Sequence, residues 1–88
     1  MSDTIERLRI LGAQLDAAWV EVTALEAEKL RRYKAWDPYR REVGAEADSY
    51  RLPAAYAQTA AMESRKRAEV LEADYTTLAL QLAAEVCR

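Results

Sequence analysis

The sequence contains no histidine and only one cysteine. Without histidine the chain lacks the commonest general base and metal ligand, and nothing else in it would activate a serine, threonine or cysteine nucleophile. It also has no glycine-rich phosphate loop and no pair of cysteines. Cys87 alone excludes an internal disulfide and fits a reducing compartment. We therefore expect a cytoplasmic protein that is not an enzyme and that holds no cofactor and no metal.

Long apolar runs are absent as well. No segment approaches the ~20 apolar residues needed to cross a bilayer, and the first residues lack the basic flank and apolar stretch of a signal peptide. We expect no membrane contact. The 88 residues include only two glycines and two prolines, whereas 18 are alanine. This composition is typical of long helices and coiled coils, and the sequence predicts an all-α protein with one domain, 1–88.

The first helix is expected over about residues 3–36. Asp3 and Glu6 form a capping-box pattern at its start. Apolar residues then recur at helical spacing, at Ile5, Leu8, Leu11, Leu15, Ala18, Trp19, Val22, Leu25, Leu30, Tyr33 and Trp36. The pair Asp37-Pro38 should end or kink this helix, because the residue before a proline is pushed out of the α region.

A turn region is expected at 37–52, with a short kinked helix from Pro38 to Val43 that Gly44 would terminate. The second helix should run over about 53–87. It could start at Pro53 or a little earlier, capped by Asp48 or Ser49, and the sequence leaves this open. The two helices would form an antiparallel hairpin.

A turn centred near residue 48 predicts the register of this hairpin. Trp36 would lie opposite Ala60, and Leu25 would face Leu71. The basic triplet 65–67 would lie beside Lys29 and the residues that follow it. Large residues of the first helix would then meet small ones of the second, which fills space at native density. The alternative is that the alanines serve helix propensity only.

The apolar stripe of the first helix is wider than a two-helix seam requires. Five further apolar residues fall outside both stripes, namely Ile10, Val20, Met62, Val70 and Leu80. Together these features predict a second buried face, and hence a homodimer built as a four-helix bundle. The residues expected in the core or at the dimer face are Leu15, Trp19, Val22, Leu25, Leu30, Leu71, Tyr75, Leu78 and Leu82.

Charge is divided unevenly along the chain. Residues 29–67 hold ten of the thirteen basic residues and five acidic ones, for a net charge of +5, and the rest of the chain carries −7. Aromatic residues lie among these basic groups. The expected partner-binding residues are Arg31, Arg32, Lys34, Trp36, Tyr39, Arg40, Arg65, Lys66 and Arg67.

Trp, Tyr and Arg dominate the energetics of protein interfaces. The leading hypothesis is therefore a small non-enzymatic interaction module, of the adaptor, inhibitor or chaperone type found among phage proteins, that binds a protein partner through this surface. One alternative is a nucleic-acid-binding hairpin, because cations and flat rings also suit phosphates and bases; the acidic pI of 5.2 argues against it. Another is a structural assembly subunit. In the simplest case the aromatics close the hairpin and the charges are only solvated.

Overall fold

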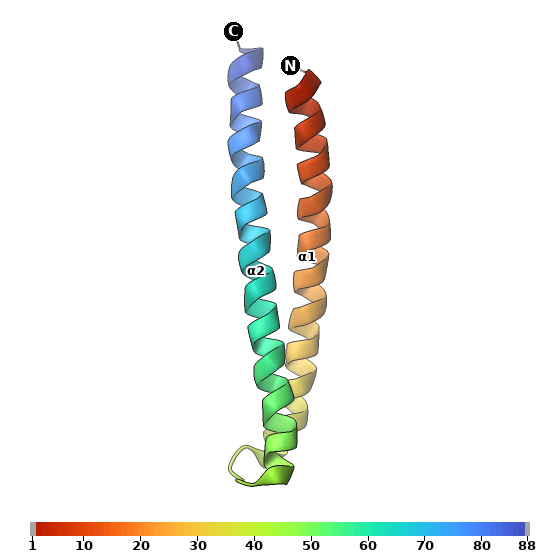
Figure 1. The fold of residues 1–88 in the computed structure, drawn as a ribbon, viewed down its shortest axis with the longest axis vertical. Helices are drawn as coiled ribbons and strands as arrows, with labels where there is room; N and C mark the ends of the chain where they lie inside the picture. Colours follow the sequence, from red (N-terminus) through yellow and green to blue (C-terminus); the bar gives the residue numbers. More distant parts are fainter. Residues whose placement is uncertain (1, 88) are drawn as a thin grey trace.

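The chain folds as a hairpin of two long helices lying side by side, with both termini at one end and the turn at the other (Figure 1). The computed structural model describes residues 2–87. Helix α1 spans Ser2–Trp36, the 3-10 turn η1 spans Asp37–Tyr39, and helix α2 spans Ala45–Val86. No strand occurs among the described residues. The expected all-α hairpin is confirmed.

Helix α1 ends where the sequence predicts, at Trp36. Asp3 in its first turn and Lys34 in its last complement the helix dipole. The short helix expected over Pro38 to Val43 is not formed. Only η1 is helical there, and the chain then continues through a turn into Gly44. The proline at the start of η1 favours one tight turn, and the backbone amides of Arg40 and Glu42 close this segment by donating to the carbonyls of Asp37 and Tyr39.

Helix α2 begins at Ala45, which is earlier than both of the starts that the sequence left open, Pro53 and a start capped by Asp48 or Ser49. Pro53 therefore lies inside the helix. An interior proline loses one backbone hydrogen bond and costs roughly 3 kcal/mol in a helix. Two features of the preceding turns offset this cost. Glu46 and Asp48 lie at the positive end of the helix dipole, and Ala47 is buried against the rest of the hairpin.

The register differs from the expected one by one heptad. The hydroxyl of Thr4 donates to Glu85 across the helices at 3.5 Å, and the ring of Tyr39 stacks on that of Tyr50. Both pairs of residue numbers add to 89, whereas a turn centred at residue 48 requires 96. The expected register is therefore wrong, because α2 starts earlier and moves the centre of the turn toward residue 44.

A shift of seven residues keeps the same faces of the two helices in contact, but it changes which residues of α1 and α2 lie opposite each other. Trp36 now lies at the level of Ala54 instead of Ala60, and Leu25 lies near Ser64 instead of Leu71. The basic triplet 65–67 moves away from Lys29 and its neighbours.

The core is a narrow seam of mostly small side chains. Its buried residues are Thr4, Val22, Ala47, Ala54, Ala61, Ser64, Ala68 and Leu78. Four of these are alanines spaced seven residues apart on α2, which lets the two backbones approach closely over about six helical turns. The expected core residues Leu15, Trp19, Leu25, Leu71, Tyr75 and Leu82 are half-buried along this seam. Leu30 is 67% exposed, so it does not belong to the core.

Candidate protein-binding surface

The turn end is closed by two aromatic clusters. Tyr39 of η1 stacks on Tyr50 of α2, with ring centroids 4.6 Å apart and planes 4° from parallel. The hydrogen bond with Tyr50 raises the pKa of the Tyr39 hydroxyl above 10.0, and the electrostatic interaction with Tyr50, the loss of solvation and the negative charges of Glu46 and Glu42 raise it further. This stack joins η1 directly to the first turns of α2.

The second cluster is centred on Arg40. Its guanidinium lies 5.0 Å from the ring centroid of Trp36 and 5.8 Å from that of Tyr33. The two rings meet edge-on at 5.8 Å, and the hydroxyl of Tyr33 donates to Gln58 of α2. Cation–π contacts of this kind contribute about 0.5–1 kcal/mol each at exposed sites. Three of the expected binding residues, Trp36, Tyr39 and Arg40, thus hold the turn in one shape.

Other apolar side chains at this end point outward. Val43, in the turn before α2, is 97% exposed, and Tyr56 is 70% exposed. Leu52 is 41% exposed and lies one helical turn before Tyr56 on α2. Within residues 2–87, neither Arg41 nor Lys34 forms an ion pair, and both are exposed. We call Val43, Leu52, Tyr56 and Arg41 the tip surface.

Most other cations near the turn already have carboxylate partners. Glu28 accepts from Arg31 and from Nε of Arg32, the latter at 2.7 Å. Arg40 lies 3.7 Å from Asp37, and the carboxylate of Asp48 is 3.1 Å from Arg51. These pairs are exposed and contribute little to stability, but they reduce the positive potential of this end.

The basic triplet 65–67 lies elsewhere. Nη2 of Arg65 is 2.6 Å from Oε1 of Glu26, and its guanidinium lies 5.5 Å from the ring centroid of Trp19. The hydrogen bond and charge of Glu26 raise the pKa of Arg65. Arg67 pairs with Glu21 at 3.0 Å. The triplet therefore faces acidic residues of α1 and does not join the basic residues of the turn end, because the register is one heptad, or ~10 Å, from the expected one.

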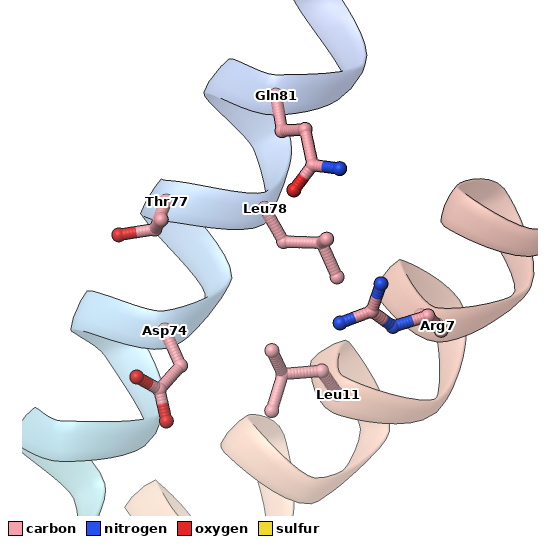
Figure 2. A pocket seen from close by; sticks show the side chains of 6 residues that line it. All are labelled: Arg7, Leu11, Asp74, Thr77, Leu78 and Gln81. Atoms are coloured by element: carbon pink, nitrogen blue, oxygen red, sulfur yellow. The ribbon is translucent and has the colours of Figure 1, made fainter. Parts of the chain in front are cut away.

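At the end bearing the termini, a shallow groove runs between the two helices. Figure 2 shows Leu11 and Leu78 in it, with Arg7 of α1 reaching toward α2. Asp74, Thr77 and Gln81 of α2 line the other wall, and the hydroxyl of Thr77 points away from the groove. These polar groups belong to different types and do not converge on one point. Among residues 2–87 no three potential metal ligands come together. The groove therefore gives no basis for a reaction or a metal site.

No family model, curated protein or solved structure matches this chain. Neither helix, over the part of the chain that the structure describes, is long and apolar enough to span a membrane.

Sequence reasoning missed Val43 and Leu52 as surface residues. The sequence puts Val43 at the end of the expected short helix and Leu52 in the turn region 37–52, or in the first turn of the second helix if Asp48 or Ser49 caps it. A helix read through Pro53 would have shown that Leu52 and Tyr56 share a face, because they are four residues apart. The full exposure of Val43 depends on the path of the turn, and no local sequence pattern reveals it.

Proposed function

We propose that this chain is a non-enzymatic interaction protein, which binds a protein partner through the tip surface. The observation that carries the proposal is the contrast between the two sets of side chains at the turn. Aromatic stacking and the contacts of Arg40 brace the turn, whereas Val43, Leu52 and Tyr56, at the same end of the hairpin as Arg41, are left in solvent. A rigid surface loses little conformational entropy on binding, and apolar groups rimmed by cations are the composition of a binding hot spot.

The partner is a protein with an acidic rim, in preference to a nucleic acid. A nucleic-acid surface needs several cations free to replace counterions along the phosphates. Of the ten basic residues between 29 and 67, six are paired with carboxylates within the described residues. The free cations that remain are spread over both helices and the turn, which suits a few ion pairs at the edge of an apolar contact.

Dimerisation and a role in assembly are part of the same proposal. The hairpin exposes 6563 Å² of surface, against about 5,200 Å² expected for a compact protein of its mass. The difference exceeds the ~800 Å² that each partner buries in an interface of standard size. A second copy of the chain, in a four-helix arrangement, would cover part of this excess. The cytoplasmic location expected from the lone cysteine also belongs to this proposal.

Capture experiments with tip variants test the proposed function. Val43→Asp adds a charge at a fully exposed position, so it should leave the helical fold intact and abolish capture of the partner from a lysate of the source organism. Val70→Asp is the matched control, because it makes the same change at an exposed position of α2 far from the turn. If both variants capture the same protein as the parent does, the tip surface is not the binding site.

Nuclease treatment and salt separate the protein partner from a nucleic acid. Binding to phosphates should weaken with a log–log salt slope of about −0.9 for each phosphate contacted. A contact centred on Val43 and Tyr56 should respond far less, and it should survive nuclease treatment of the lysate. A steep slope, or loss of capture after nuclease, would favour the nucleic-acid alternative.

A further inference from the structure

The outer face of α1 carries an uncharged stripe opposite the seam. Its six residues, all exposed and alternately three and four positions apart, are Ile10, Ala13, Ala17, Val20, Ala24 and Ala27. All seven charged residues of α1 between 7 and 30 lie off it: Arg7, Arg9, Asp16, Glu21, Glu26, Glu28 and Lys29. We call these six residues the outer stripe. Alternating steps of three and four residues are the spacing of a coiled-coil seam.

Charges of opposite sign extend the outer stripe at its two ends. With the same spacing it continues to Glu6 and Asp3 toward the N-terminus, and to Arg31 and Lys34 toward the turn. All four side chains are exposed. Glu6 and Arg31 also pair within their own helix, with Arg9 and Glu28, and a partner across the dimer would share these charges, whereas Asp3 and Lys34 form no ion pair within residues 2–87. Helix propensity alone accounts for alanine on an outer face, but it does not account for acids at one end, bases at the other and no charge between them.

Because the acids lie at one end of the outer stripe and the bases at the other, two copies of the stripe in antiparallel orientation bring the acids of each copy to the bases of the other. We propose that the outer stripe packs against the outer stripe of a second copy of this chain, with the two α1 helices antiparallel and related by a twofold axis. Facing residues then have numbers that add to 37. Asp3 meets the second copy's residue 34, a lysine, and Glu6 meets its residue 31, an arginine. Ile10 and Val20 each face an alanine, so large and small side chains alternate across the contact.

A second copy fits this surface better than an unrelated helix does. An antiparallel pair brings both charged ends into attractive contacts at once, whereas a parallel pair would place Asp3 and Glu6 against their own copies. The alanine-rich centre allows a close approach of the two backbones, as it does in the seam. The surface in excess of that of a compact protein is large enough for such a contact.

The assembly that results has a defined shape. The two α1 helices lie at its centre, the α2 helices lie outside, and the two turns point away from each other. This deepens the dimerisation included in the proposed function, because it names the surface. It also assigns Arg31 and Lys34 to the contact between copies and leaves the tip surface uncovered at each end, so the dimer presents two copies of it.

Sedimentation of the parent and two charge variants tests the surface. The parent should have roughly twice the chain mass of 10.0 kDa at micromolar concentration. Val20→Glu places two carboxylates near the twofold axis, where they repel each other, so it should reduce the mass to that of one chain. Thr59→Glu adds the same charge to an exposed position of α2 and should leave the dimer intact. A monomeric parent, or a Val20→Glu variant as dimeric as the parent, overturns the proposal.

Cysteine cross-linking tests the antiparallel direction. In a Cys87→Ser background, Ala13→Cys and Ala24→Cys chains are mixed and oxidised. The mixed disulfide between residues 13 and 24 of different copies should form in preference to either like pair. Two copies of residue 13 would be about 11 residues, or ~16 Å, apart along the axis, beyond the reach of a disulfide. Predominance of like pairs would show parallel packing and overturn the proposal.

A charge exchange tests the ends of the stripe. Asp3→Lys and Lys34→Asp should each weaken the dimer at low salt, and the double variant should restore it, because the attractive pairs return with reversed sign. A double variant weaker than both single variants overturns the pairing. These results are independent of the tip surface: Val43→Asp should remain dimeric, and Val20→Glu should still capture the partner as a monomer. A chain that forms the dimer but captures no partner would contradict the proposed function and leave the dimer contact supported.

Discussion

Gly12 of α1 lies directly against the ring of Tyr75 of α2. A Cβ atom added at residue 12 would be 3.3 Å from Cε2 of that ring, which is a tight contact. A large ring therefore occupies the space that a side chain at residue 12 would take. Nearer the turn, α2 supplies the small residues of the seam and α1 the large ones. At Gly12 and Tyr75 the roles of the two helices are exchanged.

We predict that Gly12→Ala slightly stabilises the hairpin. Alanine is favoured over glycine inside a helix by about 1 kcal/mol. The opposing contact is with the edge of a half-buried ring, which can move by a few tenths of an ångström. The melting temperature at a fixed protein concentration should rise by a few degrees. Ala73→Gly, at an exposed position of α2 outside the outer stripe, is the control and should lose about 1 kcal/mol. A lower melting temperature for Gly12→Ala would mean that Tyr75 cannot move.

Ala61→Leu should destabilise the protein by about 1–3 kcal/mol, because a larger side chain in a well-packed seam forces the backbones apart. Ala61 is only 3% exposed. Ala55→Leu makes the same change at an exposed position of α2 and should have little effect. Chemical denaturation of the two variants measures the difference. Equal stabilities would contradict the observed seam and register.

Gly44→Ala should destabilise the hairpin by about 1 kcal/mol or more, since φ at this residue is 123°, where a side chain is strained. Nothing lies within 4 Å of the added Cβ, so the cost would come from the backbone alone. Thermal melting compares this variant with Gly12→Ala, for which the opposite sign is expected. A stabilised Gly44→Ala would show that the turn into α2 takes another conformation.

The titration of Tyr39 should report the aromatic stack at the turn. Its pKa in the folded chain is raised above the ordinary value of 10.0. The stabilisation linked to this shift is therefore fully present below pH 10.0 and is lost as the pH rises through the folded pKa. Ultraviolet absorbance of tyrosinate should show one tyrosine titrating late, and Tyr50→Phe should return its pKa toward 10.0. Tyr56→Phe should remove a tyrosine without changing the late one.

Local signals in the sequence predicted several features correctly. Asp37-Pro38 ends α1 at Trp36, because a proline constrains the residues next to it wherever they are in the fold. The five apolar residues outside the stripes, Ile10, Val20, Met62, Val70 and Leu80, lie off the seam as their spacing indicated and are all more than half exposed in the single hairpin; the second buried face expected from them stays a prediction. Their exposure follows from helical periodicity alone, once the stripe that faces the other helix is known.

The start of α2 could not be predicted from the same local rules. Pro53 reads as the first residue of a helix because an interior proline is costly. In the structure the cost of the interior proline is offset, because the helical turns before Pro53 bury Ala47 and stack Tyr50 on Tyr39. These gains come from contacts with residues of η1 and α1. Local rules consider only the residues around Pro53 and therefore do not include such contacts.

The sequence by itself determined the two helices, the face that each turns to the other and the outward direction of the remaining apolar residues. All of these follow from the spacing of side chains along one helix. Only the tertiary structure decided the register. A pattern that repeats every seven residues looks the same after a slide of seven, so the seam could not distinguish the two alignments. The conformation of the segment between Trp36 and Ala45 determines which of the two alignments forms. It thereby places Arg65 against Glu26 and away from the basic residues of the turn end.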